Sequence, residues 1–81
     1  MNKNEVTNRV KKAIANVLKV AESEISDDAN FIFDLGADST QSIELVAAFE
    51  EEFDVEMDEA KALEVQTVSD AVSFISGYLN S

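Results

Sequence analysis

The apolar residues of this chain recur at the three- and four-residue spacing of amphipathic helices, and no stretch alternates with the two-residue period of a β-strand. The first apolar stripe predicts a helix from about Glu5 to Ala21. Its members are Val6, Val10, Ala13, Ile14, Val17 and Leu18. The pattern therefore predicts an all-α fold.

A second helix is predicted to begin at Ser39. Asp38 is a good N-cap, and Gln41 lies three residues later, as in a capping box. Gly36 can adopt backbone angles that other residues avoid, which suits a sharp turn into a helix. We expect a buried side made of Ser42, Leu45, Val46, Phe49 and Phe53, and an outward side made of Thr40, Glu44, Ala47, Ala48 and Glu51.

Two further helices are predicted after the second. The stretch MDEAKALEV supports a short third helix with Met57, Ala62 and Val65 facing inward. The last helix follows Thr67, which is expected to cap it with Asp70 at the third helical position. Its expected buried stripe is Val68, Ala71, Val72, Ile75 and Leu79.

The segment from Glu22 to Asp38 is long for a loop in so small a domain, and long ordered loops are often functional. Its large apolar residues could fix it to the helices. They are Ile25, Phe31, Ile32, Phe33 and Leu35. Because 81 residues can bury one small core and no composition break marks a linker, residues 1–81 are predicted to form a single domain.

The chain has no cysteine and no histidine, so it lacks thiolate ligands and the commonest general base near neutral pH. A serine nucleophile would lack its usual base, and the stretch GADST does not match a nucleophile elbow. The acids of residues 27–38 do not follow the EF-hand pattern. We therefore expect neither catalytic residues nor a metal site.

Ser39 is instead a candidate for covalent modification by another enzyme. A hydroxyl in the first turn of a helix lies where unpaired backbone N–H groups and the positive end of the helix dipole favour an attached phosphate. Ser39 could therefore carry a phosphodiester. The alternative is that Ser39 simply begins a helix that Asp38 already caps, which is a common place for serine.

The net charge of −11 is unevenly distributed along the chain. Residues 1–21 carry five basic and one acidic side chains, whereas residues 38–64 carry ten acidic and one basic. Such a field repels nucleic acid and anionic membranes and attracts proteins with basic patches, although an acidic surface can also serve solubility alone. The N-terminal residues match neither a secretory signal nor a transit peptide, and no apolar run is long enough to span a membrane. A cytoplasmic location is therefore expected, with a processed organellar protein as the alternative.

The stretch FIFDLGADSTQSIELVAAFEEEFDVEM resembles the acyl carrier protein family, whose signature is L-G-A/x-D-S-L followed by E-L-V-x-x-x-E-E-E-F-D. The similarity extends from the first predicted helix through TVSDAVSFI near the end. It implies a four-helix bundle with a long loop between helices one and two and a short third helix. It also implies that Ser39 bears a phosphopantetheine arm whose thiol carries acyl groups as thioesters, so the thiol is supplied from outside.

The resemblance assigns roles to the residues around Ser39. Asp38 would help a phosphopantetheinyl transferase (holo-acyl-carrier-protein synthase) engage the serine, Gly36 would permit the turn, and Leu35 would anchor the loop. Acyl ligases, acyl transferases and synthases would dock through basic patches. The implied partner-facing residues are Thr40, Ile43, Glu44, Ala47, Glu50, Glu51 and Glu56. The carrier itself is expected to be a monomer and not an enzyme.

Several positions differ from the family's usual residues. Thr40 stands where leucine is usual, Ala47 where methionine is common, and Phe33 where an acid is usual. Gln41 replaces an acid and Asp58 a proline. These changes remove apolar contacts from the second helix and make a specialised carrier at least as well supported as the fatty-acid housekeeping carrier. An aminoacyl or polyketide carrier, and an unmodified acidic adaptor with the same fold, remain alternatives.

The seventeen acidic side chains of the chain predict how its stability responds to salt. They repel one another, so moderate NaCl or a divalent cation should raise the Tm by screening, without saturating at one ion per chain. Thermal unfolding followed by circular dichroism across a salt series and a CaCl₂ series measures this. A sharp one-to-one calcium titration at high affinity would show a dedicated metal site instead.

Overall fold

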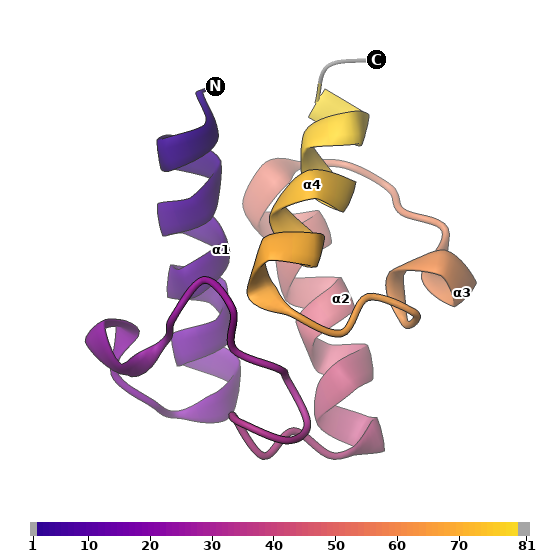
Figure 1. The fold of residues 1–81 in the computed structure, drawn as a ribbon. Coiled ribbons are helices and arrows are strands. Elements are labelled where there is room, and N and C mark those ends of the chain that lie inside the picture. The colour runs from indigo at the N-terminus through magenta and orange to yellow at the C-terminus, as the bar shows by residue number, and fades with distance from the viewer. Residues whose placement is uncertain (1, 80–81) are drawn as a thin grey trace.

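The structure, a computed structural model, describes residues 2–79 as four α-helices. The helices are α1 (Lys3–Leu18), α2 (Ser39–Phe53), α3 (Glu59–Ala62) and α4 (Val68–Leu79), and a 3₁₀ turn, η1 (Glu22–Glu24), lies in the first loop. Figure 1 shows α1 and α4 beside each other with α2 behind them, and α3 to one side. The predicted all-α fold with a long first loop and a short third helix is confirmed.

The core forms where the apolar stripes of α1, α2 and α4 meet, because α1 packs against both other long helices. The most deeply buried side chains are Ile14, Ile75, Val6, Val10 and Val68. The predicted stripes are confirmed for most of their members. Partly buried instead are Val17, Leu18, Ser42, Ala62, Val65 and Leu79. Ala48 was expected to face outward and is instead partly buried against the core. It lies three residues after the buried Leu45, which places it at the edge of the same face.

Helix α1 begins and ends earlier than predicted. Asn2 caps it, since the Asn2 side-chain oxygen accepts a hydrogen bond from the N–H of Glu5 at 2.8 Å. Lys19 ends it in the left-handed region, with φ of 60°. Lysine seldom adopts this conformation, whereas glycine signals it in a sequence, so the pattern carried no mark of the true end.

The loop between α1 and α2 is fastened to the start of α4. The N–H of Phe31 donates to the carbonyl of Gln66 at 2.9 Å, and the N–H of Val68 donates to the carbonyl of Ala29 at 3.0 Å. An isolated antiparallel bridge joins Asn30 to Thr67 between these bonds. The long loop is therefore an ordered part of the fold.

The apolar side chains of this loop divide into two groups. Ile25 and Phe31 are buried, and Leu35 is partly buried against the core, as predicted. The prediction was wrong for Ile32 and Phe33, which are 58% and 87% exposed. The N–H groups of both residues donate to the Asn30 side-chain oxygen at 2.9 Å, and this side-chain turn leaves the two side chains outside the core.

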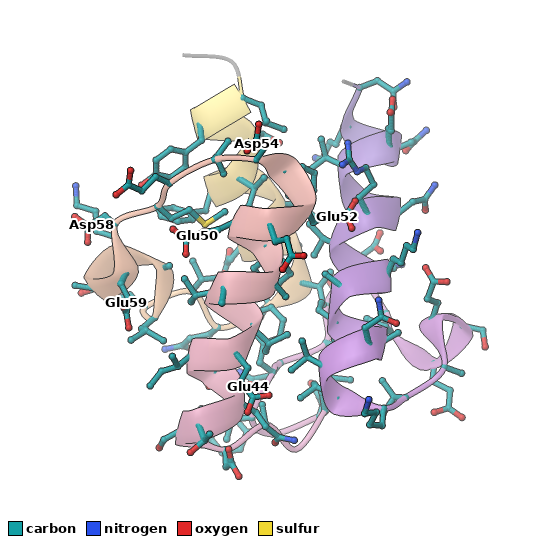
Figure 2. All side chains as sticks on the ribbon, turned by 180° about the vertical axis from the view of Figure 1, so that it is seen from behind. Glu44, Glu50, Glu52, Asp54, Asp58 and Glu59 are labelled. Atoms are coloured by element: carbon teal, nitrogen blue, oxygen red, sulfur yellow. The ribbon has the colours of Figure 1, made fainter. Side chains whose placement is uncertain are left out.

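Arg9 joins α1 to the end of α2. Its Nε lies 2.7 Å from Glu52 Oε2, and a second guanidinium nitrogen donates to the Glu52 carbonyl. The guanidinium carbon lies 4.9 Å from the centroid of the Phe53 ring, which is a cation–π distance. Figure 2 shows Glu52 on the side of α2 that faces α1. The charged side chains thus reinforce the apolar packing of the two helices.

Replacing Arg9 tests this contact. We expect Arg9→Ala to lower the free energy of unfolding by about 1–2 kcal/mol, because it removes a charged hydrogen-bond pair that is only partly exposed, together with its contact on Phe53. Lys12→Ala, at an exposed position of the same helix, should change it by less than about 0.5 kcal/mol. Urea unfolding of the three proteins measures the difference. Equal stabilities of the two variants would show that Arg9 contributes nothing specific.

Candidate functional site

Ser39 is the first residue of α2 and is exposed. Its hydroxyl forms no hydrogen bond with any residue of the described range 2–79. Immediately before it, the predicted capping box is present. Asp38 Oδ1 accepts from the N–H of Gln41 at 2.8 Å, and Gln41 Oε1 accepts from the N–H of Asp38 at 3.1 Å. The box fixes the start of the helix and leaves the Ser39 hydroxyl free.

The turn ahead of the helix depends on Gly36, whose φ is +73°. Apart from the two chain neighbours, no residue has an atom within 4 Å of the place that a Cβ would occupy, so the backbone angle restricts this position and the surroundings do not. The N–H of Ala37 donates to the carbonyl of Phe31 at 2.8 Å, and Ala37 is buried. The turn therefore packs inward and directs Ser39 outward.

The start of α2 fits a phosphodiester on Ser39. The N–H groups of Ser39 and Thr40 take no part in the capping box, and α2 is a helix of 15 residues with a dipole that favours negative charge at this end. The acid at Asp38 is already engaged by the N–H of Gln41. An exposed hydroxyl and two N–H groups in the same exposed turn can accept a bulky anionic substituent.

An apolar cavity of about 310 Å³ lies between α2, the α3 region and the first loop. Ser42 is part of its wall and lies three residues beyond Ser39, a rise of about 4.5 Å along the helix. The buried part of the wall is formed by Phe31, Leu45, Val46, Phe49, Met57, Ala71 and Ile75. The sequence analysis did not predict this cavity, because each of these residues also fits the pattern of an ordinary core.

The cavity exists because α3 spans the gap beside α2 without filling it. Helix α3 has four residues, and none of them is buried. The segment before it is held at two points: the N–H of Met57 donates to Glu50 Oε2, and the N–H of Asp58 donates to the Tyr78 hydroxyl, each at 2.9 Å. Asp58 also caps α3 by accepting from the N–H of Lys61 at 3.2 Å. These bonds fix the segment before α3 to α2 and α4.

The predicted partner-facing residues lie mainly on the outer side of α2. Thr40, Glu44, Ala47 and Glu51 are exposed there, and so is Ile43 at 51%, while Glu56 is exposed in the segment after the helix. Glu50 differs, because it is half-buried and its carboxylate accepts the N–H of Met57. The structure thus gives Glu50 a place in the fold, and the other six residues form an open face.

The acidic surface extends beyond the residues chosen from the sequence. Figure 2 shows Asp58 and Glu59 at α3 on the side of the molecule where Glu44 projects from α2. Both acids are exposed. The sequence pattern did not indicate these two acids, because they come close to α2 only after the chain turns back. The turn is at Asp54, whose φ of 52° ends the helix.

Residues 2–79 contain no group of three or more acids that could together hold a metal ion. None of the helices in this range has the length and apolar character needed to cross a bilayer.

Comparison with known families shows which family the chain belongs to. A family described as "phosphopantetheine attachment site" matches residues 8–75, a range that begins within α1, includes the start of α2 and ends within α4. Domains of this family hold phosphopantetheine as a covalently bound cofactor and are not catalytic themselves. Because the match covers well over half of the sequence and the fold agrees, this chain belongs to the phosphopantetheine-carrying family, in keeping with an acyl carrier protein.

Proposed function

We propose that the chain is an acyl carrier protein and that Ser39 bears the phosphopantetheine. The observation that supports this most is the exposed, unbonded Ser39 hydroxyl at the capped start of α2, one turn from a residue that lines an apolar cavity. When bound, the cofactor supplies a thiol that holds acyl groups as thioesters. The chain supplies position, exclusion of water and recognition.

The neighbours of Ser39 have separate tasks in this proposal. Asp38 fixes the helix start through the N–H of Gln41 and leaves a carboxylate beside the serine for the phosphopantetheinyl transferase and its metal. Gly36 allows the turn, and Leu35 holds the loop on the core. Together they present one hydroxyl in a fixed position to an enzyme that must find it.

The cavity favours an acyl cargo over an aminoacyl one. Its buried wall is made of apolar side chains, and transfer of an alkyl chain from water to such a wall gains about 0.8 kcal/mol per methylene. An amino group placed there would lose its hydration and gain few partners, which is costly. An unmodified adaptor would need neither the cavity nor an exposed serine beside it.

Partner enzymes dock on the open acidic face in this proposal. Glu44, Glu51 and Glu56 are exposed and form no ion pair within residues 2–79, so they are available to basic patches of acyl ligases, acyl transferases and synthases. Charges at such a rim set the rate and orientation of encounter more than the affinity. The small side chains of Thr40 and Ala47 favour a specialised pathway, because partners of a typical carrier would find less apolar surface there.

Modification at Ser39 is tested by mass. A broad-specificity phosphopantetheinyl transferase with coenzyme A should add one phosphopantetheine to the chain, and Ser39→Ala should abolish the addition. The circular dichroism spectrum and Tm of the variant should stay close to those of the parent, because Asp38 still caps the helix. Thr40→Ala, one residue further on, is the control and should still be modified. Addition to the Ser39 variant, or no addition to the parent, would refute the proposal.

The specialised pathway is tested by restoring the apolar side chains. Thr40→Leu with Ala47→Met should raise kcat/KM with a typical ketoacyl synthase several-fold, chiefly through slower dissociation, because about 25 cal/mol is gained per Å² of apolar surface buried. The control is Asn8→Leu with Asn16→Met on the exposed side of α1, which should leave kcat/KM unchanged. If the parent already matches a typical carrier, Thr40 and Ala47 have no bearing on partner choice.

A further inference from the structure

Three of the large apolar side chains that are exposed on the protein also line the cavity. They are Ile32, Phe33 and Leu63, with exposed fractions of 58%, 87% and 44%. A side chain that both lines a cavity and faces solvent stands at its opening, whereas the buried lining forms its floor. We call these three residues the apolar rim. Ile32 and Phe33 come from the loop before α2, and Leu63 comes from the end of α3.

The exposure of Phe33 is built into an ordered turn. The Asn30 side-chain oxygen accepts the N–H groups of both Ile32 and Phe33, and the N–H of Asn30 donates to Asp34 Oδ2 at 2.7 Å. Asn30 is in turn paired with Thr67 at the start of α4. The backbone of Phe33 is thus fixed while its ring remains in water, which is unfavourable for so large an apolar group until something covers it.

Two kinds of occupant could cover the ring: an alkyl chain held in the cavity, or an apolar side chain of a partner enzyme. The rim is continuous with the apolar lining of the cavity, and Ser42 brings the same lining within one turn of Ser39. An alkyl chain that enters the cavity from an arm on Ser39 must therefore cross the opening. A partner side chain would meet the rim without using the volume behind it. The continuity favours the alkyl chain.

We propose that Phe33 determines cargo specificity: its ring covers the part of an alkyl chain that crosses the cavity opening, so the protein retains chains long enough to enter and does not retain an acetyl group. This inference rests on the proposed function. An acetyl group has no methylene chain to place in the cavity and leaves the ring exposed. An octanoyl chain would occupy the cavity and the opening together, and its methylenes would bury the ring.

The test compares acetyl and octanoyl cargo on three variants. A broad-specificity transferase attaches acetyl- or octanoyl-phosphopantetheine to Ser39 from the corresponding acyl-coenzyme A, and mass spectrometry verifies each product. Phe33→Gln removes the apolar ring without adding charge, and Phe33→Leu keeps an apolar side chain. Ala21→Gln, at an exposed position of the same loop that does not line the cavity, is the matched control.

Two measurements report on the covered chain: the Tm of each loaded protein relative to its unloaded form, and the rate at which hydroxylamine cleaves the thioester. Octanoyl loading should raise the Tm of the parent, Phe33→Leu and Ala21→Gln. In Phe33→Gln this rise should be smaller by roughly 4–8 °C, the change expected for one modest contact in a domain of this size. Cleavage of its octanoyl thioester should be several-fold faster, and the acetyl forms of all four proteins should behave alike.

Specific outcomes would overturn the inference. If octanoyl-loaded Phe33→Gln shows the same rise in Tm and the same cleavage rate as the parent, the chain does not touch the ring, and slower turnover of that variant by a synthase would assign the ring to a partner enzyme. Equal changes in the acetyl and octanoyl forms would show an effect on the fold alone. Failure to load the parent protein would refute the proposed function, which is a different result from normal loading with no effect of Phe33.

Discussion

Helix α1 buries its apolar stripe against α2 and α4 at the same time, and the rest of the structure is arranged around that shared contact. Val10 and Ile14 on α1 and Ile75 on α4 are fully buried. A chain of 81 residues buries a smaller fraction of its surface than a longer one does, so its stability depends on one continuous core. The loop before α2 adds Ile25 and Phe31 to this core, which is why a long connection can be ordered in so small a protein.

The cavity lies where α2 does not pack against α1. Because α1 engages both long helices, the side of α2 away from α1 is left to the short α3, the first loop and part of α4, which together bound the cavity. Glu50 and Tyr78 hold the chain ahead of α3 by accepting backbone N–H groups, so the space is bounded without being filled. Empty apolar volume lowers stability, and its presence beside the proposed site of attachment is consistent with a function that fills it.

Two groups of charged side chains can be distinguished: those that form ion pairs within the fold and those that face solvent on α2. Arg9 and Lys11 on α1 pair with Glu52 and Asp27, so two of the five basic residues near the N-terminus contribute to the fold. The acids on the outer side of α2 have no such partners within residues 2–79 and leave a strongly negative face next to Ser39. The acids that stabilise the fold are therefore different residues from the acids proposed to attract basic partners, although some members of the two groups are adjacent in the sequence.

The sequence by itself determined the helices, the capping box and the position of Ser39, because periodicity and capping are local properties that neighbouring residues decide. It also placed Thr67 and Asp70 correctly at the start of α4. The tertiary structure alone decided which loop side chains are buried and which are exposed to solvent. Ile32 and Phe33 are large apolar residues like Phe31. The turn around Asn30 leaves these two exposed while Phe31 is buried. The cavity, the structural use of Glu50 and the addition of Asp58 and Glu59 to the acidic face likewise depend on where α3 is held, which is set by contacts between residues far apart in the chain.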